Sequence, residues 1–428
     1  MLHGTGHVDH CPSAPSGAPP AAPAACQARH HALRVFRWHR GDPGDPAELL
    51  SDFLAGNGLP VRNLGRTADK NKTIGDGTIC GAALYVSADA GCVMVGGDLG
   101  APSPVPDVPD VYAVVYQHNS KSQEKSGGGA DRSDGWRGAS WQPGPGRPGD
   151  ERLEPGQPGA WQLGPWRESW SRDEHARAVT AVRQAIGRGD VYQVNVVGHA
   201  SAAYSGDPGP ALRRVAALPG ARYGGVLAGD GWALATASPE TLVEVRDGRV
   251  ITRPIKGTRP ATPEGLRELL GSAKERAEHV MIVDLERNDL ARLPGTGPVA
   301  VDELFAVRRW CGLWQAESVV SAPLAGEVGL ADLLRAVCPG GSVTGAPKLA
   351  ALSQIAALEP VGRGVSMGAV GWIGHDHLDL GLSIRTVAVD GSRVHAWAGG
   401  GITADSDPIA EVDEAAAKAG PLRAALAS

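Results

Sequence analysis

Lys256 has the setting in this sequence that best suits covalent chemistry. It lies in the segment PIKGT at 254–258, where a proline precedes it and a Gly-Thr turn follows, so its backbone is restrained. A lysine amine attacks carbon only after it loses its proton, which requires desolvation or a positively charged neighbour. Arg253 and Arg259 flank the lysine and could supply that charge. The alternative is a surface lysine in a basic turn.

Glu411, Glu414 and Lys418 form a second candidate group. Their spacing of three and four residues places them on one face of a helix within two turns. Paired carboxylates suit Mg²⁺, which takes one or two protein carboxylates together with waters and substrate oxygens. A lysine one turn further on can bind a substrate carboxylate as a point charge. The alternative is a solvated helix face with an ordinary Glu–Lys pair.

Glu275 and Glu278 repeat the three-residue spacing earlier in the chain. Ser272 precedes Glu275 by three residues, which is the spacing of a capping box, so Glu275 has a structural explanation. Glu278 has no such explanation and is the better candidate for a metal ligand. Two helix faces with paired carboxylates could converge on one Mg²⁺.

Two glycine-rich stretches could bind a ligand through the backbone. GGSVTGAPK at 340–348 opens into a predicted helix whose free amides can accept an anion, but it lacks the GK[ST] ending of a P-loop. AGGGI at 398–402 ends a predicted strand with three glycines, which permit close approach of a ligand. Tight turns alone also explain such glycines.

Arg385 and Glu240 are single residues with suitable chemistry. Arg385, in LSIRTV, is expected to project from a strand, where its guanidinium could bind a carboxylate. Its alternative is a salt bridge at the margin of a sheet. Glu240, in ASPETL, could act as a general acid if burial raises its pKa. Its alternative is a solvent-facing turn residue after Pro239.

The elements that must position these residues become regular from Ser171 onward. Hydrophobic spacing and capping residues predict helices over 174–188, from the N-cap Ser272 to about 293, after the 340–348 loop with Pro347 in the first turn, and from the N-cap Asp407 with Pro408 behind it. Gly420-Pro421 is expected to end or kink the last helix. Strands are predicted over 191–197, 232–238, 242–252 as a hairpin on Asp247-Gly248, 365–374, 378–389 and 393–401. Adjacent strand pairs separated by helices indicate an α+β fold with largely antiparallel sheets.

The first part of the chain is less regular. Residues 1–30 are interpreted as a disordered leader and 31–117 as an N-terminal subdomain, in which 79–97 is expected to form two strands around an Ala-Asp-Ala-Gly turn. The Gly-, Pro- and Ser-rich segment 118–168 is interpreted as a linker or insertion before a catalytic domain at 169–428.

Composition limits the classes of function. The formal net charge of −6, without a basic run, argues against a nucleic-acid binder. Six scattered cysteines without a CxxC pair are typical of reduced thiols and not of a disulfide frame or zinc site. Neither a membrane-spanning apolar stretch nor a signal peptide is recognised, so a cytoplasmic protein without a membrane partner is expected.

Several of these segments together resemble the chorismate-utilising enzymes, most closely the aminodeoxychorismate synthase component I family. The matching stretches, in family order over about 171–428, are GDVYQVN, ASPETL, RPIKGTRP, KERAEHVMIVDLERNDL, PGGSVTGAPK, SIRT and AWAGGGITADSDPIAEVDEAAAKA. The resemblance implies an anthranilate synthase component I-like fold, with two large, mainly antiparallel sheets packed as a sandwich and helices outside. The lysine in PIKGT resembles the aminodeoxychorismate branch, since anthranilate synthases typically have alanine there.

The resemblance implies roles for the reacting residues. Lys256 matches the lysine that attacks the chorismate ring at C2 and expels the C4 hydroxyl, after which ammonia adds at C4 and the lysine leaves. Glu240 matches the general acid that protonates the departing hydroxyl. Gln193 stands where water-using relatives have a lysine base, and its neutral amide suits ammonia.

The resemblance also implies a Mg²⁺ site and a substrate pocket. Glu278 and Glu411 match the Mg²⁺ ligands, with Glu414 and Glu275 behind them. The substrate-binding residues are expected to be Arg385 and Lys418 as carboxylate-binding cations, with Thr344, Gly399, Gly400 and Gly401 as the pocket wall.

Two positions depart from the family pattern: Gln315 stands near a usual histidine and Ser366 at a usual tyrosine. A glutaminase half is not recognised, so ammonia is expected from a glutamine amidotransferase partner, or from free ammonium in vitro. The implied product is 4-amino-4-deoxychorismate for folate or another p-aminobenzoate pathway. The alternatives are anthranilate or isochorismate synthesis, or a non-catalytic chorismate-binding subunit, which Gln315 and Ser366 would suit.

Overall fold

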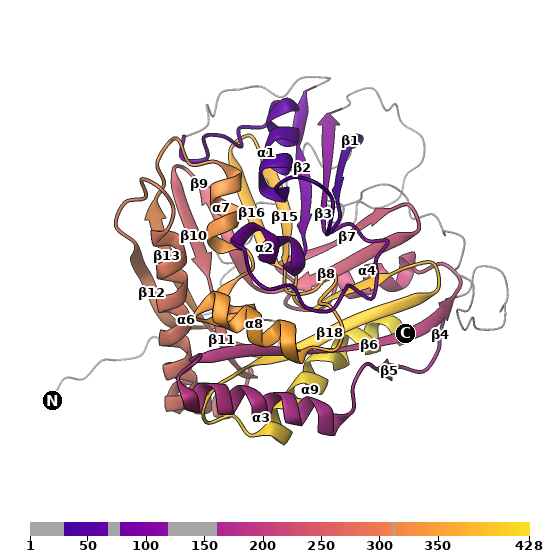
Figure 1. The fold of residues 1–428 in the computed structure, drawn as a ribbon, viewed down its shortest axis with the longest axis vertical. Helices are drawn as coiled ribbons and strands as arrows, with labels where there is room; N and C mark the ends of the chain where they lie inside the picture. The colour runs from indigo at the N-terminus through magenta and orange to yellow at the C-terminus, as the bar shows by residue number, and fades with distance from the viewer. Residues whose placement is uncertain (1–29, 67–77, 119–160, 311–312) are drawn as a thin grey trace.

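The computed structural model describes residues 30–66, 78–118, 161–310 and 313–428. In these residues the strands form two sheets, of ten and eight strands, and every pairing is antiparallel. The two sheets face each other across a common core, and helices lie outside them (Figure 1). The predicted α+β sandwich is therefore confirmed.

The ten-stranded sheet joins segments from both ends of the chain. In spatial order its strands are β1 (His30–Trp38), β3 (Val111–His118), β2 (Ile79–Val86), β15 (Ala369–Gly374), β16 (His377–Leu382), β9 (Thr241–Arg246), β10 (Arg249–Arg253), β13 (Leu313–Pro323) and β11 (Ile255–Pro260), with β12 (Ala300–Trp310) also on β13. The strands of the predicted N-terminal subdomain thus extend the same sheet as the later strands (Figure 1).

The eight-stranded sheet carries most of the glycine-rich strand ends. Its order is β14 (Gly345–Ala346), β6 (Gln193–Ser205), β18 (Arg393–Ile402), β17 (Thr386–Val389), β8 (Trp232–Ser238) and β7 (Tyr223–Gly229), with β4 (Gln162–Leu163) and β5 (Arg167–Glu168) on β6. The inter-sheet core joins Leu84 and Val243 of the first sheet to Leu234 and Trp397 of the second.

Helices cover the outer faces and the ends of the sandwich. α1 (Pro46–Gly56), α2 (Ala88–Val95) and α7 (Leu330–Val337) pack on one another, whereas α3 (Arg172–Arg188), α4 (Gly209–Ala216) and α9 (Pro408–Ala427) cover the eight-stranded sheet. α5 (Pro263–Gly271) and α6 (Ala273–Ala291) pack on β11 and β13, and α8 (Lys348–Leu358) lies against β6. A short 3-10 turn, Gly341–Val343, precedes β14. In the described residues, no helix is both long and apolar enough to cross a membrane.

Elements with local signals form as expected. α3 follows a capping box on Ser171 and ends at Gly189 in the left-handed conformation. β9 and β10 form the predicted hairpin, with φ values of 49° at Asp247 and 74° at Gly248. Asp407 caps α9 through its side chain, as expected.

One prediction about a segment was wrong, and one of the two alternatives for another is excluded. Residues 88–95 form α2 and not a second strand, because Ser87 caps the helix at Ala90 and Gly96 ends it with φ 68°. The last helix was expected to end or kink at Gly420-Pro421; it does not end there, because α9 continues to Ala427 and buries Leu422 and Leu426 in its extra turns. Lys418 is therefore not near a helix end.

Other boundaries shifted or lie outside the described residues. Pro347 is the N-cap of α8, one position before the expected first turn. Residues 1–29 of the predicted leader and residues 119–160 of the 118–168 segment lie outside the described residues. Residue 30 begins β1, and the end of the 118–168 segment forms β4 and β5 on β6.

Candidate active site

Lys256 lies in β11 directly before a β-bulge. It pairs with Ala316 of β13, whereas Thr258 pairs with Gln315, so one extra residue is inserted between them. Gly257 is that residue and has φ 77°, a conformation that favours glycine. Paired residues share a face of the sheet, so Lys256 lies on the face of Ala316, and the bulge places Thr258 on the opposite face with Gln315.

The arginines that flank Lys256 each pair with a carboxylate. Arg259 pairs with Glu275 at 3.1 Å, and Arg253 lies 3.8 Å from Glu244. The charged side chains that interact electrostatically with the half-buried Lys256 include Glu240 and Glu278. Each flanking arginine thus has a carboxylate partner that offsets its charge, and the cationic neighbourhood of Lys256 stays a prediction.

Gln193 and Lys256 converge on Gly401. A side chain at Gly401 would place its Cβ 3.0 Å from Gln193 Nε2 and 3.2 Å from Lys256 Nζ. Gln193 begins β6 and Lys256 lies in the other sheet, so the two sheets bring them together. Glycine at 401 leaves room in front of both groups.

Glu240 is a buried carboxyl between β8 and β9. Only 7% of its surface is exposed, and it accepts a hydrogen bond from Ser342 Oγ at 2.9 Å. Burial raises the pKa of Glu240 to about 7, although the Ser342 hydrogen bond and the charges of Lys256 and Arg385 act to lower it. A carboxyl that titrates near neutrality can both give and take a proton.

Arg385 does not lie on a strand, contrary to the prediction. β16 and β17, predicted as one strand, belong to different sheets, and the chain crosses between them at Ser383–Arg385. Arg385 has φ 48°, a strained conformation for a residue with a side chain. Its charge acts on Glu240, which places the guanidinium on the side of the site that holds the buried acid.

Glu278 of α6 and Glu411 of α9 approach each other across the site. Burial raises the pKa of Glu278, and the charges of Glu275 and Glu411 raise it further, whereas those of Lys256 and Lys274 lower it. Glu411 is also buried and accepts a hydrogen bond from Ser406 at 2.7 Å. The expected convergence of two acidic helix faces is consistent with this mutual effect.

Glu275 and Glu414 are held by cations. Ser272 caps α6 at the Glu275 amide, but the Glu275 carboxylate pairs with Arg259, so the capping box is only half formed. Glu414 pairs with Lys418 at 2.8 Å. Glu278 lies 3.7 Å from Lys274, a longer ion pair than those of Glu275 and Glu414, so Glu278 and Glu411 are the better candidate ligands.

Two carboxylates, those of Glu278 and Glu411, are the donors available for Mg²⁺. Among the described residues, no three His, Cys, Asp or Glu side chains form a group that could hold a metal. Two carboxylates on separate helices match the habit of Mg²⁺, which keeps waters and substrate oxygens as its other ligands. A preformed cage of the calcium or zinc type is not present in these residues.

The three glycines of β18 have different neighbours. Gly399 accepts a hydrogen bond from Lys418 Nζ through its carbonyl at 3.0 Å, and a Cβ there would clash with the Val196 carbonyl. A Cβ at Gly400 would lie 3.1 Å from Glu411 Oε2 and 3.6 Å from Lys418 Nζ. Glycine thus lets the strand pass between β6 and the acidic face of α9.

Hydrogen bonds hold the loop before β14 against β6. Thr344 is fully buried, and its hydroxyl donates to the Gly340 carbonyl at 2.8 Å. The backbone carbonyl of Thr344 accepts from the backbone N–H of Asn195 at 2.7 Å. Arg363, paired with Glu359 at 2.6 Å, also donates to the carbonyl of Asn195 at 2.9 Å and to that of Val343. This buried ion pair fixes the loop and the strand together.

Sequence reasoning did not single out Ser342, Asn195, Arg363 or Glu359. Ser342 lies inside the GGSVTGAPK segment, and the i, i+4 spacing of Glu359 and Arg363 is that of an ion pair. These signals are common on surfaces, so they do not reveal burial.

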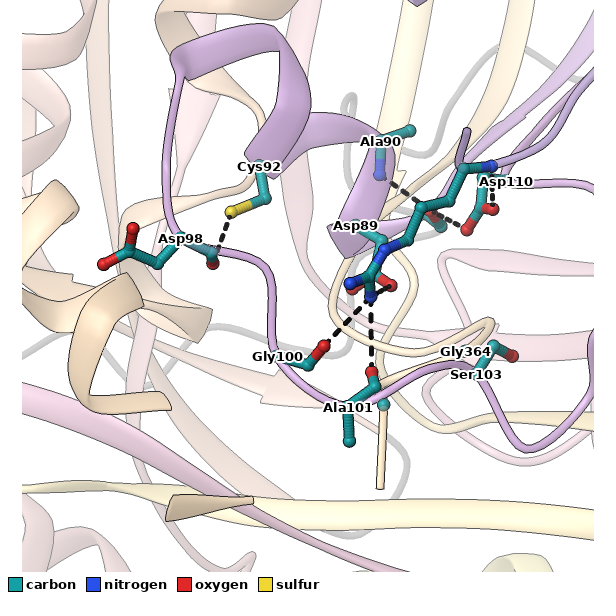
Figure 2. A network of polar contacts seen from close by, with 12 residues as sticks. Asp89, Ala90, Cys92, Asp98, Gly100, Ala101, Ser103, Asp110 and Gly364 are labelled. Carbon is teal, nitrogen blue, oxygen red and sulfur yellow. Dashed lines mark hydrogen bonds and ion pairs between the residues drawn. The ribbon is translucent and has the colours of Figure 1, made fainter. Parts of the chain in front are cut away.

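A small cavity lies behind Thr344, away from the converging side chains. Its volume is about 30 Å³, and its lining includes Asp89, Cys92 and Arg363. Arg40 holds one wall by donating to the Gly100 carbonyl at 3.0 Å and to Asp89 at 3.2 Å. Figure 2 shows another part of the lining, where Cys92 donates to the carbonyl of Asp98 at 3.1 Å. Because small-molecule sites occupy roughly 300–1,000 Å³, this cavity holds at most a few waters and is not the substrate site.

Comparison with known proteins agrees with the motifs. The sequence model of the chorismate binding enzyme family matches residues 55–424. An aminodeoxychorismate synthase component 1 from Klebsiella aerogenes is 39% identical over 256 residues, which are 58% of this chain and 57% of the relative. An anthranilate synthase component 1 from Streptomyces coelicolor is also 39% identical, over 257 residues, 58% of this chain and 50% of the relative. The chain thus spans about half the length of these curated relatives.

Among solved structures, anthranilate synthase component I from Streptococcus pneumoniae has a TM-score of 0.70, covering 98% of this chain and 95% of its own. Its sequence identity of 24% supports the fold alone. Because the family match extends over most of the sequence and takes in both sheets of the sandwich, the chain belongs to the chorismate binding enzyme family.

Proposed function

We propose that this chain converts chorismate and ammonia to 4-amino-4-deoxychorismate, as a step towards p-aminobenzoate and folate. The observation that carries the proposal is the convergence of Lys256 and Gln193 on Gly401, with Glu240 within electrostatic reach of the lysine. Similarity to relatives named aminodeoxychorismate synthase component 1 supports the same reading.

The first half of the proposed reaction needs an amine and an acid. The Lys256 amine forms a bond to ring carbon C2, the ring double bond shifts, and the C4 hydroxyl departs as water with a proton from Glu240. Glu240 suits this step because a pKa of about 7 keeps much of it protonated at neutral pH.

The second half replaces the lysine by ammonia. The ammonia lone pair forms the C4–N bond, the double bond shifts back, and the C2–N bond breaks with its electron pair on the Lys256 nitrogen. The proton released by the new C4 amine is taken by that nitrogen or by the ionised Glu240. Two allylic displacements thus replace one difficult substitution.

Glu278 and Glu411 would hold Mg²⁺, with Glu275 and Glu414 behind them. The ion would grip the ring carboxylate and offset negative charge that develops on the ring. We assign Arg385 and Lys418 to substrate carboxylates, and Thr344 with Gly399, Gly400 and Gly401 to the pocket wall.

Ammonia would come from a glutamine amidotransferase partner. The "component 1" in the names of the relatives supports a second component. Without the partner, a high concentration of ammonium should replace it.

Anthranilate synthesis is the second candidate, because a relative named for that activity is equally identical. Isochorismate synthesis and a non-catalytic chorismate-binding subunit are the remaining alternatives. One experiment separates them all: the protein is incubated with chorismate, Mg²⁺ and ammonium, and the product is identified by mass and ultraviolet absorption. We expect 4-amino-4-deoxychorismate. Anthranilate, isochorismate or unchanged chorismate would each refute the proposal in favour of a named alternative.

A further inference from the structure

Besides Ser205 Oγ at its far end, β6 has three buried polar atoms without a hydrogen-bond partner. They are Nε2 and Oε1 of Gln193 and Oδ1 of Asn195, in side chains that are 0% and 6% exposed. An unpaired buried polar atom loses its hydrogen bonds to water without replacement, so such atoms usually meet a ligand or a water. Two unpaired amides on one strand therefore point to something that binds between them.

Both amides lie on the face of β6 that looks into the site. Gln193 and Asn195 alternate with Val194 and Val196, which pack into the core under α3. Asn195 is paired directly with Gly401 of β18, the residue whose missing side chain leaves room before Gln193 and Lys256. The Asn195 side chain thus borders the same space as the lysine amine.

The backbone of this strand is held in place on both sides. The backbone N–H of Asn195 donates to the backbone carbonyl of Thr344, and the backbone carbonyl of Asn195 accepts from Arg363 at 2.9 Å. The side-chain oxygen therefore projects from a fixed point, which is the condition for orienting a small ligand.

The chemistry of the two amides suits ammonia. Ammonia has three N–H donors and one lone pair, and the lone pair must face the carbon that it attacks. Two neutral amide oxygens can accept two of the N–H groups and leave the lone pair directed away from them. A charged carboxylate in their place would instead hold the ammonium ion, which has no lone pair to react.

We propose that Asn195 and Gln193 together form the binding site of the nitrogen nucleophile, in which Asn195 accepts an N–H bond and orients ammonia towards the ring. This inference rests on the proposed function and adds the residue that selects the nucleophile. It also explains why β6 keeps two amides in a buried position.

The test measures amination at saturating chorismate while ammonium is varied. Asn195→Leu removes the acceptor with little change in shape, so we expect the KM for ammonium to rise about fivefold to tenfold, the value of one hydrogen bond. The KM for chorismate should stay within about twofold. Asn195→Asp retains an acceptor oxygen and should recover part of the loss only at higher pH, where free ammonia is plentiful.

Methylamine gives a second measurement that a structural role would not affect. Methylamine has one N–H fewer than ammonia, so the wild type should have a much higher kcat/KM for ammonia than for methylamine. Asn195→Leu should reduce the ratio of these two kcat/KM values. If the leucine variant does not fold, Asn195→Ala carries the same comparison. Tyr204→Phe is the matched control, because it removes another buried hydrogen bond from β6, 2.5 Å long, at the far end of the strand.

The outcomes are separable from those for the proposed function. If the wild type aminates chorismate but the variants keep its ammonium KM and its preference over methylamine, the subsite is refuted and the amides merely bind water. If the control changes the same parameters, strand stability and not the subsite is responsible, which also refutes the inference. If the wild type aminates nothing, the proposed function itself fails.

Discussion

Glu240→Gln should make the protein more stable above neutral pH while it abolishes most of the activity. Glu240 is buried, and its partner Ser342 donates a hydrogen bond that a glutamine oxygen can equally accept. The substitution therefore removes the ionisable group without removing the contact. Any pH-dependent difference between the two proteins reports the cost of the buried charge.

The magnitude follows from the pKa. Burial raises the pKa of Glu240 from 4.5 to about 7, and each pKa unit corresponds to about 1.36 kcal/mol. Because the folded pKa is the higher one, the folded state binds the proton more tightly, so wild-type stability falls as pH rises from about 4.5 to about 7. Above that window the full penalty, about 3 kcal/mol, is present in the wild type and absent from the variant.

Urea denaturation of both proteins near pH 5 and near pH 8.5 measures this directly. The free energy of unfolding of Glu240→Gln, relative to wild type, should rise by about 2–3 kcal/mol between the two conditions. Burial and the charge of Asp289 also raise the pKa of Glu286, and the charge of Glu240 adds to that shift, so in Glu240→Gln the pKa of Glu286 should be less raised. An equal difference at both pH values would refute the buried-charge reasoning.

The same group should govern the rate. If protonated Glu240 is the general acid, wild-type kcat falls as pH rises above about 7, and Glu240→Gln loses about 10²- to 10⁴-fold. A wild-type kcat, measured at saturating free ammonia, that climbs steadily to pH 9 would contradict this role.

Three further changes test other parts of the site. Gly401→Ala should lower activity strongly with little loss of stability, because its Cβ would crowd the side chains of Gln193 and Lys256. Gly187→Ala in α3 is the control: its Cβ meets open space, so kcat should be unchanged and the melting temperature should rise slightly. Lys348→Met should cost about 3–5 kcal/mol in urea denaturation, since it leaves Asp289 buried without its partner at 2.7 Å; wild-type stability would refute this. Glu278→Gln should weaken the activation by Mg²⁺ in a metal titration at fixed chorismate, whereas an unchanged activation constant would remove Glu278 from the ligand set.

The sequence predicted correctly those elements that are set by their own capping and turn residues. The Asp247-Gly248 hairpin and the start of α9 need only neighbouring residues. α2 was missed because its apolar residues also fit strand alternation, and only the caps at Ser87 and Gly96 decide between the two. The extension of α9 beyond Pro421 depends on the sheet under Leu422, which no local window contains.

The site was predictable in its residue types and not in its contacts. Lys256 and Gln193 come from different sheets, so their meeting at Gly401 follows from the fold. The choice of Glu275 as the partner of Arg259 likewise requires knowing that β11 packs on α6. Asn195 carried no signal, because an asparagine in a strand reveals neither its burial nor its lack of a partner.

The central claim is that the Lys256 amine attacks the substrate. The most direct test compares the rate of amination of chorismate by ammonium in wild type and in Lys256→Ala, with circular dichroism to confirm that the variant is folded. We predict that the folded variant loses activity by a factor on the order of 10³ or more, because no other amine replaces the nucleophile. A folded Lys256→Ala protein that forms 4-amino-4-deoxychorismate at the wild-type rate would contradict the account.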